Sequence, residues 1–86
     1  ETPKARMKMK LEIVSSQVSF VGKMREEKKI ASALTLMANS MGEDSPAFFD
    51  NSDEDCDYCD VGFAYDMSDW KAEDIKWQWR KIKKGL

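Results

Sequence analysis

The chain has 86 residues, of which 42% are hydrophobic and 35% charged, and its formal net charge is −2. This length allows one small domain, since domains usually run to about 100–150 residues. The composition is too apolar for a fully disordered chain and too rich in charge for a membrane span. We therefore expect a soluble intracellular protein, in a compartment that the sequence does not identify.

The absence of histidine limits the chemistry that this chain can perform. Histidine is the commonest general base and metal ligand, and Ser–His and Cys–His nucleophile pairs require it. The sequence also contains no glycine-rich phosphate loop and no nucleophile elbow. We expect a protein that is not an enzyme and that uses no cofactor.

Charge is segregated along the chain. Residues 1–29 carry a net charge of +4, residues 30–70 contain ten acids and no Lys or Arg, and residues 71–86 carry +4. Such a long stretch without a cation is unusual at average composition. Two explanations are open: the basic ends neutralise the acidic middle within the molecule, or the acidic middle meets a basic partner.

The N-terminal part has the pattern of a β-strand. Residues 6–14 alternate strictly between apolar and polar side chains, and this period of two predicts a strand with one buried face. The next apolar group, residues 18–21, fits either a second strand of a hairpin or an irregular entry into a helix.

From about residue 23 the pattern changes to that of a helix. Apolar side chains recur at spacings of three and four over 23–41, which predicts an amphipathic helix. The expected core stripe is Ile30, Leu34, Met37 and Met41. Gly42 stands where a left-handed C-terminal cap is expected.

Residues 43–60 predict a long acidic loop. They contain eight acids, a Ser-Pro pair and few β-branched residues, interrupted by the aromatic pair Phe48-Phe49. Residues 61–65 could form a short strand, although Gly62 weakens that assignment.

The C-terminal segment, residues 69–84, has features of both a helix and a strand. Residues 75–80 alternate in polarity as a strand would. However, acids at its start and basic residues at its end match the helix dipole, so we predict a helix. The fold class that follows is α+β, with the 23–41 helix packed on a small sheet.

Cys56 and Cys59 form the only spaced thiol pair. Flanking carboxylates raise thiol pKa values, which disfavours a redox role, and two thiols alone do not complete a zinc site. A metal or redox module built on this pair is the weakest alternative; a local disulfide or two packed thiols explains it more simply.

A second alternative is a small nucleic-acid-binding protein. The C-terminal segment interleaves aromatic and basic side chains that can stack on bases and neutralise phosphates. The residues expected to do so are Trp70, Trp77, Lys81 and Lys84, together with the basic N-terminal strand. Two Trp filling a small core would account for the same pattern.

The leading hypothesis is a protein-interaction module, or a small subunit of a larger assembly. Its acidic segment would dock on a basic partner surface, and regularly spaced carboxylates could imitate a phosphate backbone, as inhibitors of nucleic-acid-binding proteins do. The expected contact residues are Glu43, Asp44, Phe48, Phe49, Asp50, Asp53, Glu54, Asp55, Asp57, Tyr58 and Asp60.

Overall fold

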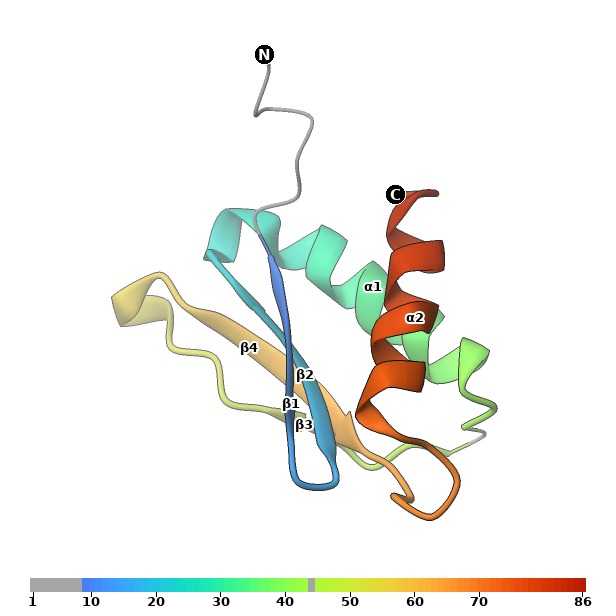
Figure 1. The fold of residues 1–86 in the computed structure, drawn as a ribbon. Helices are drawn as coiled ribbons and strands as arrows, with labels where there is room; N and C mark the ends of the chain where they lie inside the picture. Colours follow the sequence, from blue (N-terminus) through green and yellow to red (C-terminus); the bar gives the residue numbers. More distant parts are fainter. Residues whose placement is uncertain (1–8, 44) are drawn as a thin grey trace.

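The computed structural model describes residues 9–43 and 45–86 (Figure 1). It has the predicted α+β fold, with four antiparallel strands in the order β1-β2-β4-β3 and two helices. The strands are β1 (Lys10–Val14), β2 (Gln17–Gly22), β3 (Phe48–Asp50) and β4 (Cys59–Ala64). The helices are α1 (Glu27–Ser40) and α2 (Ala72–Lys83), with short 3-10 turns at η2 (Met24–Glu26) and η3 (Glu54–Cys56).

The first two strands form a hairpin. Val14 pairs with Gln17 across a two-residue turn, and the rest of β1 and β2 continues in the same register. The strand predicted over 6–14 is confirmed for residues 10–14, while 6–8 lie outside the described residues. The helix-entry reading of 18–21 is wrong, because these residues lie within β2.

The predicted helix over 23–41 is confirmed as η2 followed by α1, which are helical from residue 24 to 40. Gly42 has a φ of 74°, in the left-handed region that glycine adopts without strain. The Glu43 N–H donates to the Ala38 carbonyl and the Gly42 N–H to the Asn39 carbonyl, both at 3.0 Å. This is the Schellman pattern, and it ends α1 as expected.

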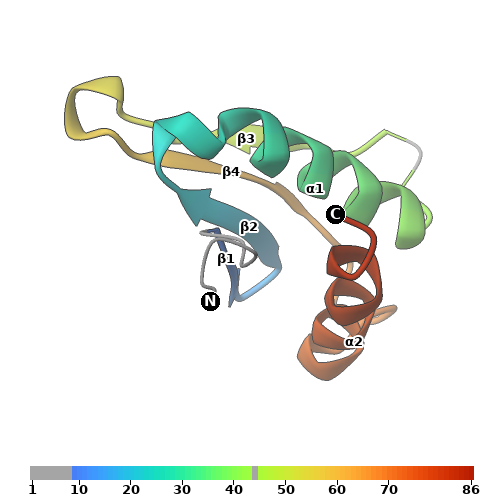
Figure 2. The ribbon, with the colours of Figure 1, turned by 90° about the horizontal axis from the view of Figure 1, so that it is seen from above.

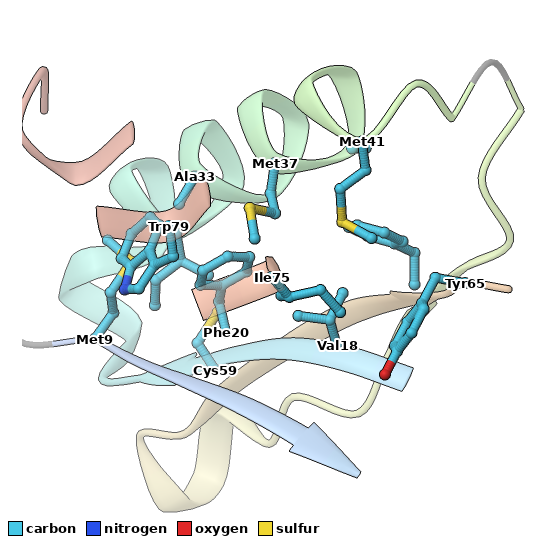
Figure 3. Close-up of a cluster of buried hydrophobic side chains, with 13 residues drawn as sticks. Met9, Val18, Phe20, Ala33, Met37, Met41, Cys59, Tyr65, Ile75 and Trp79 are labelled. Carbon is cyan, nitrogen blue, oxygen red and sulfur yellow. The ribbon is translucent and has the colours of Figure 1, made fainter. Parts of the chain in front are cut away.

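The core lies between one face of the sheet and the two helices (Figures 2 and 3). Phe20 of β2 packs edge-on against Trp79 of α2, with ring centroids 4.9 Å apart. The largest fully buried side chains are Phe20, Phe63, Ile30, Met37, Ile75 and Val18. The sheet and both helices therefore contribute to one cluster, as expected for one-faced elements.

The predicted helix stripe is correct except at Leu34. Ile30, Met37 and Met41 are buried, whereas Leu34 is only partly buried and Ala33 is fully buried. The helix turns its Ile30–Ala33–Met37 line to the sheet. Leu34 then falls on the flank that faces β3, where the core ends.

The prediction of one long loop over 43–60 is wrong. Phe48–Asp50 form the edge strand β3, residues 54–56 form η3, and β4 begins at Cys59. Aromatic residues favour strands, and acidic residues are tolerated on an edge strand because that edge is hydrated. The predicted strand over 61–65 is confirmed for residues 61–64, which belong to β4.

The helix predicted over 69–84 is confirmed for residues 72–83, and the strand alternative is wrong. The Asp74 carboxylate accepts from the Lys71 N–H at 3.2 Å at the start of α2. Acids occupy the first turn and basic residues the last, as the dipole favours. Neither α2 nor any other helix among the described residues is long and apolar enough to cross a membrane.

Candidate functional site

A groove of about 690 Å³ lies between the start of α1 and the hairpin formed by β3 and β4. It opens on the side of the sheet that the helices cover, next to the edge strand β3. The lining residues are Met24, Glu27, Ala31, Leu34, Asp50, Ser52, Asp53, Glu54, Asp55, Cys59 and Val61. We call this hollow the acidic groove.

The apolar part of the acidic groove comes from α1 and β4. Ala31 and Leu34 lie on the flank of α1, with Met24 seven residues before Ala31 on the same side of the helical segment. Val61 and the buried Cys59 contribute from β4. These side chains continue the core outward, so the groove has an apolar floor.

The polar part consists of five carboxylates and the Ser52 hydroxyl. Glu27 projects from α1, and four more acids come from the hairpin: Asp50, Asp53, Glu54 and Asp55. No Lys or Arg from the described residues lines the groove. No lining cation in the described part of the chain therefore neutralises the five negative charges.

Short hydrogen bonds set the shape of the hairpin beside the groove. The Ser52 N–H donates to Asp50 Oδ1 at 2.9 Å, and the Asp55 N–H donates to Asp53 Oδ1 at 3.0 Å. The Asp60 N–H donates to Ser52 Oγ at 2.9 Å and ties the turn to β4. Hydrogen bonds from the Ser52 side chain and backbone lower the pKa of Asp50 below its ordinary 3.8, so this carboxylate stays ionised.

Phe48, at the start of β3, lies at the edge of the sheet. Its ring packs edge-on against the buried Phe63, with centroids 6.1 Å apart, yet Phe48 is 53% exposed. The strand thus presents an accessible aromatic side chain two residues before Asp50.

Two predicted contact residues, Phe49 and Asp60, lie on the opposite face of the sheet. Each residue directly precedes a groove residue in its strand: Phe49 precedes Asp50 in β3, and Asp60 precedes Val61 in β4. Successive side chains of a strand point to opposite faces of the sheet. The Phe49 ring lies over Gly62, where an added Cβ would be 2.6 Å from its tip. Neither side chain belongs to the acidic groove.

The Asp60 carboxylate is in an unfavourable environment. Its Oδ1 atom is buried and has no hydrogen-bond partner among the described residues. Desolvation and the nearby Glu12 and Asp50 raise its pKa, partly offset by a hydrogen bond from Tyr58. Desolvation and Asp60 in turn raise the pKa of Tyr58. Asp60 is therefore partly buried, whereas the acids of the groove are exposed to solvent.

Asp57 has a structural contact instead of an open position. Its carboxylate accepts from the Met24 N–H at 3.1 Å and lies 3.7 Å from Lys23 Nζ. It therefore joins the tip of the hairpin to the start of the helical segment. Of the remaining predicted residues, Glu43 follows the C-terminal end of α1, and Asp44 lies outside the described residues.

The thiol pair is divided between surface and interior. Cys56 is exposed and Cys59 is buried, and both are free thiols. Residues 9–43 and 45–86 contain no group of three or more Cys, Asp or Glu side chains placed to hold a metal ion.

The C-terminal residues of the nucleic-acid alternative lie in two different environments. Trp70 is half-buried and packs against the core, whereas Trp77 is 56% exposed on the outer side of α2. Lys81 and Lys84 are exposed and follow Trp77 at helical spacing.

Sequence reasoning missed the contribution of α1 to the groove. Glu27, Ala31 and Leu34 follow the i, i+4, i+7 spacing of one helix flank, so a signal was present. Nothing in the sequence places that flank beside the hairpin.

No match was found when the chain was compared with protein-family models, with curated proteins and with solved structures.

Proposed function

We propose that this protein is a non-catalytic interaction module that docks on a basic partner through the acidic groove. One observation carries the proposal: five carboxylates surround an apolar floor, with no cation among the described lining residues. Concentrated like charge destabilises a fold by self-repulsion, so its presence calls for a compensating role.

The groove suits the side chain of a lysine or arginine. Such a side chain has an apolar stem and a charged head, so the stem packs on apolar surface while the head meets carboxylates. In the groove, Leu34 and Val61 offer that surface, and Glu27 stands across from the acids of the hairpin. The apolar floor favours this mode of binding over imitation of a phosphate backbone.

Neutralisation by the protein's own basic residues is the competing explanation. Lys23 does pair with an acid, but with Asp57 outside the groove. The basic residues in the last turn of α2 are not among the groove lining. Among the described residues, no basic side chain lines the groove, which supports a role for its acids in binding a partner.

A pair of matched double variants tests the proposal. Glu54→Gln with Asp55→Asn removes two groove charges whose side chains make no recorded hydrogen bond within the described residues. Asp69→Asn with Glu73→Gln removes the same charge from exposed positions outside the groove. The probe is a fluorescent, capped oligolysine peptide, titrated by anisotropy.

We expect the groove variant to bind the peptide about three- to tenfold more weakly, because exposed ion pairs contribute about 0.2–1 kcal/mol each. The control variant should change affinity less, and the difference should shrink between about 0.05 M and 0.3 M salt as screening increases. Equal weakening by both variants would show that only net charge matters, and would overturn the groove as the docking site.

A second candidate function rests on the exposed Trp77 beside Lys81 and Lys84. An exposed tryptophan with neighbouring lysines is a stacking platform for single-stranded nucleic acid. Trp77→Ala should then weaken binding of an oligothymidine by about tenfold, measured by fluorescence anisotropy, since stacking contributes about 1–3 kcal/mol per base. Absence of binding by the unaltered protein would remove this candidate.

A further inference from the structure

The strand β3 leaves one edge of the sheet open beside the acidic groove. Within residues 9–43 and 45–86, the strand order is β1-β2-β4-β3, so that β3 is terminal and pairs with β4 alone. Figure 2 shows β3 at the margin of the sheet, on the far side of β4 from β2. An open edge of this kind can accept a further strand through main-chain hydrogen bonds.

The recorded hydrogen bonds show which backbone groups face the open edge. Ala64 N–H donates to the Ala47 carbonyl at 3.4 Å, and Asn51 N–H donates to the Asp60 carbonyl at 2.8 Å. In an antiparallel pair, residues that bond to the neighbouring strand alternate with residues that bond away from it. Phe48 and Asp50 therefore direct their N–H and C=O groups to the open edge.

The side chains of the same two residues lie on the face of the sheet that α1 covers. Phe48 pairs with the buried Phe63, and Asp50 pairs with Val61 of the groove floor. Side chains of adjacent strands at the same register lie on the same face. A strand added at this edge would therefore place every second side chain beside Phe48 and Asp50, on the groove side.

We propose that β3 binds an extended segment of a partner protein by strand addition, with a basic side chain of that segment entering the acidic groove. The added strand would carry an apolar side chain next to Phe48 and a lysine or arginine two residues away, next to Asp50. This inference rests on the proposed function and specifies its geometry. Charge complementarity selects the occupant, because Glu27, Asp50 and the hairpin acids face that position.

The probe is a capped, strand-forming peptide in which threonine alternates with valine and lysine, so that the valine and lysine side chains share one face. Binding is followed by NMR, together with amide hydrogen exchange of β3. The Phe48 and Asp50 amides should become protected by at least about tenfold at saturation. The Phe49 amide faces β4 in the same strand and should change little, which makes it an internal control.

Two changes to the probe sharpen the test. Methylation of the peptide nitrogens that face β3 should abolish binding, whereas methylation of the alternate nitrogens should leave it intact, because only one set bonds to the edge. Replacing lysine by glutamate should also abolish binding. The variant Asp50→Asn should bind several-fold more weakly, and Asp60→Asn, on the opposite face, should bind as the unaltered protein does.

The outcomes separate this inference from the proposed function. Charge-dependent binding without protection of Phe48 and Asp50 would overturn strand addition while leaving docking in the groove intact. If neither this peptide nor oligolysine binds, both fail. Protection that appears in the protein alone as its concentration rises, with a dimer in sedimentation, would show that a second copy occupies the edge and would overturn the assignment to a partner protein.

Discussion

The two faces of the hairpin formed by β3 and β4 make different use of one acidic segment. On the face toward α1, Asp50 is hydrated, and hydrogen bonds from Ser52 keep its pKa low. On the opposite face, Asp60 has a raised pKa and a buried oxygen with no hydrogen-bond partner in the part of the chain that the structure describes. An aspartate is therefore exposed to solvent on one face, whereas the ionised form of an aspartate on the other face opposes folding.

The aromatic neighbours Phe48 and Phe49 show the same division. Phe48 is 53% exposed beside the groove, whereas Phe49 packs over Gly62 on the other face. Successive residues of a strand point to opposite faces, so a segment that is continuous in sequence becomes two surfaces. The number of acids in a segment therefore does not by itself define a binding site.

A large effect is expected at the contact of Phe49 with Gly62. In Gly62→Ala the added Cβ would lie 2.3 Å from the Val18 carbonyl oxygen and 2.6 Å from the Phe49 ring. We expect a loss of about 3 kcal/mol in the free energy of unfolding, measured by urea denaturation. Gly85→Ala is the control, since its nearest atom is 3.6 Å away and its stability should hardly change. An unaffected Gly62→Ala protein would show that the Val18 carbonyl and the Phe49 ring do not pack closely on Gly62.

The boundary between core and groove on α1 is the next test. Met37 is fully buried and Leu34 only partly, so Met37→Ala should cost about 2–5 kcal/mol and Leu34→Ala about half as much or less. Leu34→Asp should still fold, because its carboxylate reaches the groove, whereas Ile30→Asp should unfold the protein. Thermal melts monitored by circular dichroism would measure all four, and unfolding of Leu34→Asp would place that residue in the core.

Asp57 distinguishes a structural acid from a groove acid at the tip of the hairpin. Asp57→Asn weakens the contacts with Lys23 and the Met24 N–H, and we expect a loss of about 0.5–1 kcal/mol. Asp55→Asn should change stability by less than about 0.5 kcal/mol. Chemical denaturation of the two variants at equal salt decides between them, and equal stabilities would contradict the distinction.

The smallest effect is the pH dependence of Asp60. Because its folded-state pKa is raised above the ordinary 3.8, ionisation opposes folding, and stability falls as pH rises from below that value through the folded-state pKa. Asp60→Asn should therefore gain about 0.5 kcal/mol or less at pH 7 and gain nothing well below pH 3.8. Asp50→Asn should behave oppositely, since a lowered pKa stabilises the fold above the ordinary value. Melting temperatures measured from pH 2.5 to 7 should show Asp60→Asn gaining stability, and Asp50→Asn losing stability, relative to the unaltered protein as pH rises. Parallel curves for the two variants would refute this prediction.

The sequence by itself determined the elements whose pattern is local. The period of two over residues 10–14, the helical period from Ile30 to Met41, the cap at Gly42 and the dipole-matched ends of α2 are all confirmed. Each depends on residues within a few positions of one another, which is why a single sequence is enough to find them.

Only the tertiary structure decided where these elements meet. The pairing of Phe48–Asp50 with β4 is a contact between segments with little strand pattern of their own, and it divides the acidic residues between two faces. Glu27 and Leu34 become groove residues because α1 crosses the sheet with that flank toward β3. Long-range packing and strand register set both results, and local periodicity does not specify which segments lie beside one another.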